Sequence, residues 1–566
     1  MRHSIRRTAT VLLAALAAAA TVDARTQPVR ARNGMVASQN ATASRIGADV
    51  LAEGGTAVDA AVATAFAMAV THPTAGNVGG GGFLLYRPAS GDPVAYDFRE
   101  TAPTGSSPTM WLRDGAYDAK RHHFSHLAVG VPGTVAGLHL AWKEQGRLAW
   151  KRLLAPAIAL ARDGFVVTDQ LSRSLKGVLP EMQPYPASVA QFTKGGVPYE
   201  MGDVIRQPDL ARSLQRIAEK GPAGFYEGET ALLIEKEMKR SGGLITRADL
   251  KAYEAKKRVP LRGTYRGYDV LTMPPISSGG TALLQMLNLL EGYDLKQRGW
   301  GSAATVHLLA ETMRRAFADR AHYLGDPDFD PTLAATVDRL ISKPYAESLR
   351  KTIAGDRATR SSPTSFEWPA EGTETTHLSV VDSSHNAVAL TYTLEYGYGS
   401  RIVVPGAGFL LNNEMGDFNA GPGLTDENGL IGTEPNLAAP RKRMLSSMTP
   451  TILSKDGQPY LVVGAMGGRT IINTVLLTIL NVVDFGMNIQ DALDAPRFHH
   501  QWLPDRIAYE AFGLSPDTRA LLESRGHVLS EIALQGNAQG IVYDPKNGVL
   551  EGGADSRDPD GAAVGR

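Results

Sequence analysis

The chain has 566 residues, of which 43% are apolar and 20% charged, ordinary values for a globular protein with a large core and room for several domains. Lys plus Arg and Asp plus Glu are equal in number, so the charge balance gives no sign of a nucleic-acid or strongly acidic partner. The chain has no cysteine, which excludes thiol nucleophiles, disulfides and thiolate metal sites.

The first residues have the pattern of a signal peptide. A basic start (Arg2, Arg6, Arg7) precedes an apolar run over residues 11–20, which is too short to span a bilayer, and small residues follow up to Ala24. We therefore expect residues 1–24 to be removed and the mature protein to be periplasmic or secreted. The adjacent Arg6 and Arg7 leave the Sec and twin-arginine routes both open. No later segment is apolar for long enough to span a membrane, so we expect no membrane association after signal removal.

Several helices are predicted before residue 330. Thr56 and Asp59 form a capping box in front of an apolar run, which predicts a buried helix over residues 57–70. Gly79 to Gly82 and a short strand at residues 83–86 follow. Thr246 and Asp249 form a second capping box. Helical periodicity recurs over residues 151–162, 208–220, 229–241, 281–291 and 303–323.

A change of composition marks residues 355–374, which are rich in Ser, Thr, Pro, Arg and Glu and predict a flexible, exposed linker. A hairpin follows, with strands at residues 377–382 and 387–394. If Asp382 pairs with Val388, His377 lies opposite Thr393, and Thr375 and Thr393 share one face of the sheet. A slip of one residue would put the two threonines on opposite faces, and the sequence leaves this register open.

The border between linker and strand can support nucleophilic chemistry. A threonine hydroxyl is a weak nucleophile without a base, but a cut just before Thr375 would create an α-amine that titrates near pH 8 and can act as that base. An exposed linker that ends at a Thr-Thr-His strand suits such a cut. By itself the pattern is weak, because threonines are common in strands.

A family resemblance strengthens this interpretation. The segment Glu374 to Asp382 resembles the self-processing site of the γ-glutamyltransferases, also called γ-glutamyltranspeptidases or glutathione hydrolases. The resemblance covers nearly the whole mature chain and includes Gly76-Asn-Val-Gly-Gly-Gly-Gly-Phe83, Asp97-Phe-Arg-Glu100, Val131-Pro-Gly-Thr-Val-Ala-Gly137, Leu410-Leu-Asn-Asn-Glu-Met-Gly-Asp-Phe418, Leu445-Ser-Ser-Met-Thr-Pro-Thr451 and Ala495-Pro-Arg-Phe-His-His500.

The resemblance implies an α+β fold, a four-layer αββα sandwich of the N-terminal nucleophile hydrolase type. It also implies that the precursor cuts itself into a large subunit, residues 25–374, and a small catalytic subunit, residues 375–566, which form a heterodimer. Thr375 resembles the nucleophile, and Thr393 the second threonine whose hydroxyl hydrogen-bonds the nucleophile.

The remaining site residues are assigned by the same resemblance. Gly467 and Gly468 resemble the oxyanion hole, where glycine allows backbone N–H groups to approach a developing anion closely. Their neighbours Ala465, Met466 and Arg469 depart from the usual Ser-Pro and Ser of the family.

Two further groups resemble the parts of the site that bind the amino-acid end of the substrate. Arg99, Ser446 and Ser447 resemble the clamp on its α-carboxylate, which the planar fork of arginine can grip with two hydrogen bonds. The side chains that resemble the site of its α-ammonium are Glu395, Glu414 and Asp417. Position 395 is asparagine in some relatives, and either residue type can accept a hydrogen bond from an ammonium group.

Three features receive a structural interpretation or are set aside. Gly79 to Gly82 lacks the ending of a phosphate loop and is expected to be structural. His499 and His500 have no HExxH pattern or third ligand, so no metal is predicted. Residues 419–443 resemble a lid loop, but Asn428 falls where a gating tyrosine sits in some relatives.

The resemblance implies hydrolysis and transfer of γ-glutamyl groups. The expected donor is glutathione, the acceptors are water, amino acids or dipeptides, and no cofactor is required. Two alternatives remain: a cephalosporin (glutaryl) acylase of the same fold, whose substrate lacks the α-ammonium, and an uncut, inactive homologue that only binds its ligand. Retention of Asp417 beside Glu414 argues against the first. The second is disfavoured by four intact residues, Thr375, Thr393, Gly467 and Gly468.

Overall fold

The computed structural model describes residues 26–361, 375–424 and 432–566. The expected signal peptide, residues 1–24, lies outside this part, as do residues 362–374 of the expected linker and Asn428 in the expected lid. Within the described ranges, no helix is both long and apolar enough to cross a membrane.

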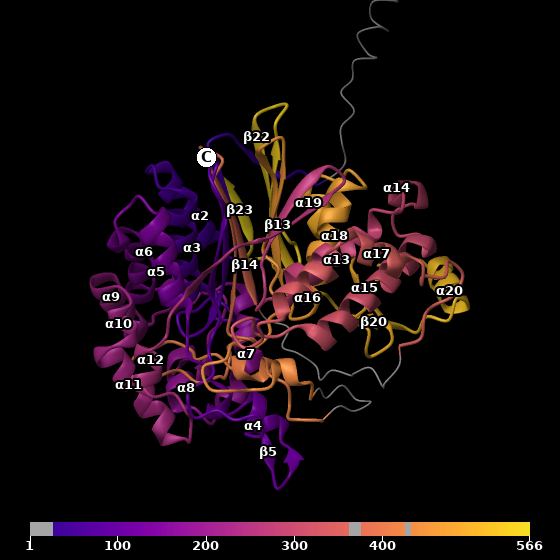
Figure 1. Cartoon of the computed structure of the whole chain (residues 1–566). Helices are drawn as coiled ribbons and strands as arrows, with labels where there is room; N and C mark the ends of the chain where they lie inside the picture. The colour runs from indigo at the N-terminus through magenta and orange to yellow at the C-terminus, as the bar shows by residue number, and fades with distance from the viewer. Residues whose placement is uncertain (1–25, 362–374, 425–431) are drawn as a thin grey trace, which may run out of the picture.

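Two antiparallel sheets of seven strands form the centre of the molecule (Figure 1). The order in the first sheet is β11 (Lys256–Arg258), β4 (Val94–Phe98), β3 (Gly81–Arg87), β15 (Ala387–Thr393), β14 (Thr376–Asp382), β2 (Gly34–Ser38) and β23 (Ala562–Gly565). The order in the second sheet is β1 (Val29–Ala31), β22 (Val549–Ala554), β21 (Asn537–Asp544), β17 (Gln458–Met466), β16 (Thr451–Lys455), β13 (Tyr268–Thr272) and β12 (Leu261–Tyr265). The sheets face each other, with β14 and β15 against β17.

Helices cover the outer face of each sheet, as Figure 1 shows. Those against the first sheet are α2 (Ala41–Ala52), α3 (Ala57–Thr71) and α5 (Thr134–Gln145), backed by α6 (Trp150–Asp163) and α9 (Pro208–Lys220). Those on the side of the second sheet are α13 (Ser278–Leu290), α18 (Thr470–Val483) and α19 (Ile489–Asp494), with α15 (Ala303–Tyr323) packed on α13. The expected four-layer αββα sandwich is thereby confirmed.

Shorter elements surround the four layers. The helices are α4 (Ala119–His123), α7 (Asp169–Met182), α8 (Pro186–Phe192), α10 (Ala223–Tyr226), α11 (Gly228–Arg240), α12 (Arg247–Lys251), α14 (Leu295–Arg298), α16 (Leu333–Leu340), α17 (Lys343–Arg350) and α20 (Pro516–Ser524). The 3₁₀ turns are η1 (His126–Ala128), η2 (Glu414–Asp417) and η3 (Glu434–Asn436). The small strands are β5 (Leu112–Arg113), β6 (Ala116–Tyr117), β7 (Phe165–Val166), β8 (Thr193–Lys194), β9 (Val197–Pro198), β10 (Val204–Ile205), β18 (Phe498–His499), β19 (Ile507–Glu510) and β20 (Leu529–Ile532).

Local sequence signals explain where several helices begin. Both predicted capping boxes are present, with Thr56 accepting from Asp59 before α3 and Thr246 accepting from Asp249 before α12. Helix α13 starts three residues before the periodic segment, because the Ser277 side chain caps it by accepting from the Gly279 amide.

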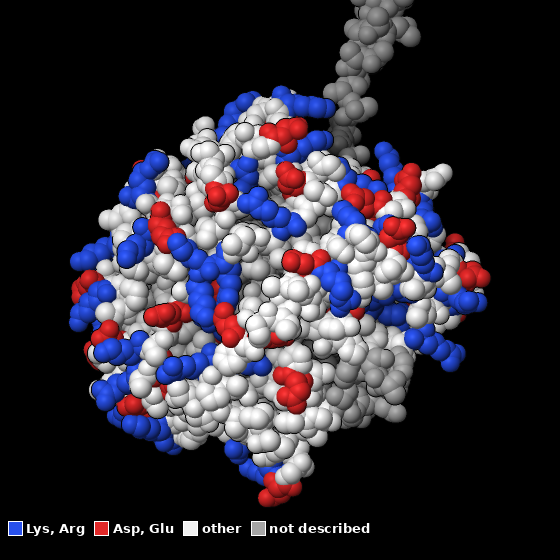
Figure 2. All heavy atoms as spheres, viewed as in Figure 1, with Lys and Arg blue, Asp and Glu red and all other residues white. Residues whose placement is uncertain are grey.

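On the face in Figure 2, basic and acidic side chains are interspersed, in keeping with the balanced charge.

The register of the β14–β15 hairpin differs by two residues from the pairing considered in the sequence. His377 pairs with Thr391 rather than Thr393, and Val381 pairs with Ala387. The cause is a tighter turn: Asp382 Oδ1 accepts from the amides of Ser384 and Asn386, and the Asp382 amide donates to the Asn386 carbonyl. A shift of two residues leaves every side chain on the same face.

Candidate active site

Thr375 lies directly before β14 and faces Thr393, the last residue of β15. The pairing of Thr376 with Tyr392 puts the two threonines opposite each other, and Thr375 Oγ1 donates to Thr393 Oγ1 at 3.3 Å. Thr375 is only 4% exposed. The hydroxyl of Thr375 is therefore oriented by a second hydroxyl in a buried setting.

Thr393 is itself held by contacts from three directions. Its Oγ1 also accepts from the Glu395 amide at 2.8 Å, and its carbonyl accepts from Asn77 Nδ2 at 2.9 Å. A Cβ added to Gly80 would lie 2.0 Å from that carbonyl, so only glycine fits there. The Gly79 to Gly82 stretch thus has a structural role beside β15.

The threonine pair opens on a small cavity of about 20 Å³. The residues around it are Arg99, Thr375, Thr393, Glu395, Glu414, Asp417, Ser446, Ser447, Met448, Gly468 and Ile471. Every residue proposed from the sequence lines this cavity except Gly467, and the structure adds Met448 and Ile471. Met448 lies within the quoted Leu445 to Thr451 segment, whereas Ile471 carries no sequence signal beyond the apolar pattern of α18.

Arg99 is buried on the wall of the cavity, and carboxylates surround it. Its guanidinium forms ion pairs with Glu414 and Asp417, and its Nη1 lies 3.7 Å from Glu100. Burial lowers the pKa of Arg99, but attraction to Glu414 and Asp417 outweighs this effect and raises the pKa overall. Burial raises the pKa of Glu414 despite its contact with Arg99. The residues expected to bind opposite ends of a zwitterion are therefore paired with each other here.

Ser446 and Ser447 are fixed by the second sheet's helix layer. The Ser446 carbonyl accepts from the amide of Ser278 at 2.8 Å, and Ser447 Oγ accepts from Arg320 Nη2 at 2.9 Å. Arg320, a buried residue of α15, was not among the residues proposed from the sequence. No sequence signal distinguished it from the other polar residues of that helix.

Gly467 and Gly468 form the turn between β17 and α18. Their φ angles are +130° and +56°, values that favour glycine over other residues. Their carbonyls accept from the amides of Thr470 and Ile471, which starts α18. Backbone N–H groups at the start of a helix attract negative charge, so the turn has the character of an anion site beside Thr375.

A larger cavity of about 470 Å³ lies on the other side of this turn, with Gly467 in its wall. Polar residues such as Gln39, His72 and Asp560 line it together with apolar ones such as Leu171 and Ile532. Burial lowers the pKa of His72 to about 4, so this ring is neutral at pH 7. The two cavities are thus adjacent across the glycine turn.

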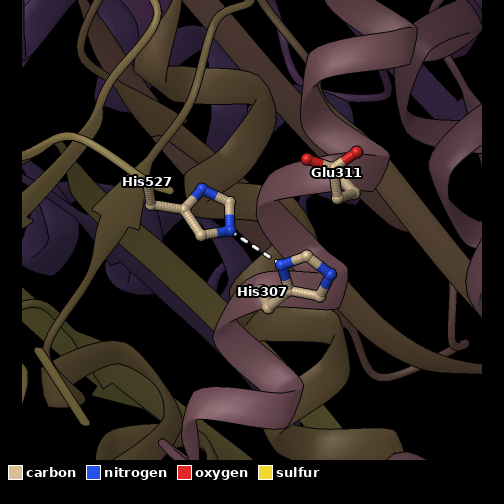
Figure 3. A group of neighbouring side chains, drawn as sticks. All are labelled: His307, Glu311 and His527. Atoms are coloured by element: carbon tan, nitrogen blue, oxygen red, sulfur yellow. Dashed lines mark hydrogen bonds between the residues drawn. The ribbon is translucent and has the colours of Figure 1, made fainter. Parts of the chain in front are cut away.

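A cluster of possible metal ligands lies elsewhere, where His307 and Glu311 of α15 approach His527 (Figure 3). His307 Nδ1 lies 2.7 Å from His527 Nε2, and His307 Nε2 lies 2.7 Å from the Ala354 carbonyl. The carboxylate of Glu311 already accepts hydrogen bonds from donors that occupy both of its oxygens, namely Arg314, Arg315, and the amide and hydroxyl of Thr359. We assign this cluster to anchoring residues 354–359, the start of the expected linker, rather than to a metal.

The adjacent residues His499 and His500 both contact polar side chains. His499 Nδ1 lies 2.7 Å from Asn473 Nδ2, and His500 Nε2 lies 3.2 Å from Asp505. Asp505 in turn contacts Arg314 and accepts from the amide of Ser361. These contacts also hold the start of the expected linker against the helix layer.

Comparison with known proteins gives a family and several relatives. The family model described as gamma-glutamyltranspeptidase matches residues 43–565. A glutathione hydrolase proenzyme from Escherichia coli (strain K12) is 48% identical over 543 residues, which cover 95% of this chain and 93% of the relative.

Solved structures of similar fold include two that bear on the chemistry. A cephalosporin acylase from Bacillus halodurans superposes with a TM-score of 0.82 at 29% identity, over 97% of this chain and 98% of the other. A gamma-glutamyltranspeptidase from Helicobacter pylori gives a TM-score of 0.55 at 45% identity, over 56% of this chain and 91% of the other.

Proposed function

The chain belongs to the γ-glutamyltranspeptidase family, and on that premise we propose that it is a self-cleaving glutathione hydrolase and γ-glutamyltransferase with Thr375 as its nucleophile. The observation that carries the proposal is the shared cavity in which the Thr375–Thr393 pair meets Arg99, Asp417 and Gly468.

Cleavage between Glu374 and Thr375 comes first. The Thr375 hydroxyl attacks the Glu374 carbonyl, and the C–N bond breaks, which converts the peptide bond into an ester and frees the α-amine of Thr375. Water then hydrolyses the ester, which releases the Glu374 carboxylate and restores the Thr375 hydroxyl. That amine, with a pKa of about 8, then serves as the general base for the same hydroxyl. The products are residues 25–374 and 375–566 once the signal peptide is removed.

The substrate exchanges partners with the site as it binds. Its α-carboxylate binds the Arg99 guanidinium and the hydroxyls of Ser446 and Ser447. Its α-ammonium binds the carboxylates of Glu414, Asp417 and Glu395. Because Arg99 is already paired with Glu414 and Asp417, a zwitterion replaces one set of ion pairs with another and adds no net charge. The cavity holds little more than one water in this structure, so these side chains must separate to admit the substrate.

The reaction then proceeds through an acyl-enzyme. Thr375 Oγ attacks the γ-amide carbonyl, and the Gly467 and Gly468 N–H groups stabilise the negative charge that develops on its oxygen. The leaving amine departs with the proton held by the α-amine. Water or the amine of an amino acid or dipeptide then attacks the ester and restores the free Thr375 hydroxyl.

The acylase alternative is weaker for a specific reason. The B. halodurans structure shares the fold, but a glutaryl group has no α-ammonium to meet Glu414 and Asp417. Those two carboxylates, buried around Arg99, suit a zwitterionic γ-glutamyl group. An uncut homologue that only binds its ligand does not require an oriented threonine hydroxyl, so the hydrogen bond between Thr375 and Thr393 argues against that alternative.

The test is expression of the full chain with its signal sequence, followed by a denaturing gel and N-terminal sequencing. We expect export and two fragments of about 37 and 20 kDa, scaled by length from the whole chain, with the smaller starting Thr-Thr-His-Leu. The purified protein should cleave a chromogenic γ-glutamyl anilide, faster when a dipeptide acceptor is added. A stable single band with full activity would refute the N-terminal threonine mechanism.

Thr375→Ala and Thr375→Ser are the control variants. We expect the alanine variant neither to cut itself nor to turn over substrate, since one hydroxyl performs both attacks, and the serine variant to retain part of each activity. If the alanine variant still cut itself, another residue would be the nucleophile, with Thr376 the nearest candidate.

A further inference from the structure

Glu395 introduces a full carboxylate into a cavity that already holds two. It is 5% exposed, and it lines the same cavity as Glu414 and Asp417. Repulsion from Glu395 contributes to the raised pKa of Glu414. A third buried carboxylate is costly unless a cation or a proton compensates it. Asparagine, the residue of some relatives at this position, has no such requirement.

His123, the last residue of α4, approaches Glu395 from the large subunit's side of the cavity. Its Nδ1 lies 3.5 Å from Glu395 Oε1, and both side chains are buried. The backbone of Glu395 has a φ of +80°, and its amide donates to Thr393 Oγ1. The left-handed turn that follows Thr393 therefore directs the Glu395 carboxylate toward His123.

Gly416 closes this pair from the other side. A Cβ added to Gly416 would lie 2.4 Å from His123 Nδ1 and within 2.8 Å of both Glu395 oxygens. Gly416 lies in η2 with Glu414 and Asp417, so the His123–Glu395 contact packs against the turn that carries the two acids expected to bind the ammonium.

The hydrogen bonds around His123 show which of its ring nitrogens carries a proton. His122 Nε2 faces the Met415 carbonyl at 3.1 Å and must donate, so its Nδ1 accepts from the Tyr117 hydroxyl at 3.0 Å. Burial lowers the pKa of His122, so it carries no second proton. The Tyr117 oxygen, 3.4 Å from His123 Nε2, can then only accept, and His123 Nε2 carries a proton.

With Nε2 protonated, His123 turns its Nδ1 toward a carboxylate oxygen. A lone pair there would face a negative oxygen, so a second proton belongs between the two atoms. We propose that His123 and Glu395 share a proton as a net-neutral pair, and that His123 is a positioning residue that holds Glu395 ready for the substrate's α-ammonium. The inference rests on the proposed function and adds to it a role for His123 in recognition of the α-ammonium.

The groups that face the pair set its proton affinity. Among the described residues, Tyr117 and His122 lie beside His123. Glu414 and Asp417 share the cavity with Glu395. The guanidinium of Arg401 lies over the rings of Phe124 and Tyr396. Loss of the shared proton at high pH would leave Nδ1 and the carboxylate repelling each other. Binding of the ammonium should then weaken.

Two substitutions of His123 separate positioning from structure. Glutamine places its amide near the position of Nε2, so no donor remains at the Nδ1 position that faces Glu395. Asparagine places its amide near the position of Nδ1 and keeps that donor. We expect His123→Gln to raise KM for a γ-glutamyl anilide about tenfold or more, the loss of one charge-assisted hydrogen bond, with little change in kcat. We expect His123→Asn to stay within about threefold of the wild-type KM.

A Glu395→Gln background makes the test specific. The amide introduced at position 395 can donate to His123 Nδ1 without a shared proton, so His123→Gln should add less than about a threefold change there. The alkaline rise of KM should shrink to the part that comes from titration of the substrate's own α-ammonium. The matched control is His126→Asn, which withdraws the side-chain nitrogen from another buried histidine–glutamate contact, His126 Nε2 to Glu237 Oε1 at 2.9 Å, away from the cavity. It should lower thermal stability without changing the pH profile of KM.

Equal effects of His123→Gln in both backgrounds, or none in the wild-type background, would overturn the pairing. If the wild-type enzyme fails to cleave the anilide at all, the proposed function fails. The His123–Glu395 pair is then tested by the unfolding midpoints of His123→Gln, Glu395→Gln and the double variant. In that case the unfolding midpoint of the double variant should shift by less than the sum of the two single shifts. Additive shifts would refute the pair in either case.

Discussion

Asp417 tests whether the acidic wall of the cavity binds an ammonium group. It is paired with Arg99 in this structure, and a substrate's α-ammonium would replace that contact. We expect Asp417→Ala to lower kcat/KM for a γ-glutamyl anilide by roughly 10- to 150-fold, the value of a charge-assisted hydrogen bond of about 1.5–3 kcal/mol. A glutaryl anilide never makes that bond, so its low rate should change little.

The control for this prediction is the comparison of the two anilides in the same variant. Equal losses would mean that Asp417 supports the fold through Arg99 rather than binding the ammonium. A wild-type preference for the glutaryl compound would favour the acylase alternative. Arg99→Lys should be a poor substitute for arginine, because lysine cannot reproduce the two-pronged grip on a carboxylate.

Sequence patterns located these side chains but not their contacts. The resemblance indicated Arg99, Glu414 and Asp417 as one binding site, and the structure places them in one cavity. That Arg99 is paired with both acids depends on side chains more than three hundred positions apart in the chain. The Ser447–Arg320 hydrogen bond was equally beyond prediction, because the arginine lies in an ordinary helical pattern.

The β14–β15 hairpin shows what a strand pattern can and cannot determine. Alternation left two arrangements open, and the structure has the one in which Thr375 and Thr393 share a face. The observed register differs by two residues from the pairing considered in the sequence, because the Asp382 side chain accepts hydrogen bonds from amides of the turn, a contact that alternation does not reveal. Helix ends with capping boxes were predicted closely for the opposite reason, since the signal is local.

The packing of β14 against the second sheet depends on a glycine. His377 bonds Thr391 Oγ1 and Ser379 Oγ, and its ring lies so close to β17 that a Cβ on Gly464 would be 2.3 Å from it. We expect Gly464→Ala to displace His377 and the start of β14, lowering the free energy of unfolding by about 1–3 kcal/mol and slowing cleavage before Thr375. Denaturant unfolding and the time course of cleavage on a gel measure the two effects.

Gly177→Ala provides the matched control. Gly177 lies within α7, and a Cβ there would meet no atom within 4 Å. It should leave cleavage unchanged and raise stability slightly, because alanine is the better helix former. Normal cleavage and stability in Gly464→Ala would show that the sheets can separate enough to admit a methyl group.

The two expected subunits are interleaved in both central sheets. In the first sheet, β14 and β15 of the small subunit lie between β2 and β3 of the large one, and in the second, β16 pairs with β13 and β22 pairs with β1. The largest apolar core draws on both parts, with Phe83 and Leu283 from the large subunit and Val381 and Ile472 from the small one. Separating them would break whole ladders of backbone hydrogen bonds and expose this core.

We therefore expect the cut enzyme to remain one particle although no covalent bond joins its halves. The chain has no cysteine, so no disulfide can link them. On size-exclusion chromatography in native buffer, both fragments should elute together at the volume of the uncut Thr375→Ala protein. In a denaturant that unfolds the sheets, the wild type should resolve into two species and the alanine variant should remain one. Two separate peaks in native buffer would contradict this prediction, because they would mean that the paired strands contribute less than the loss of entropy on association.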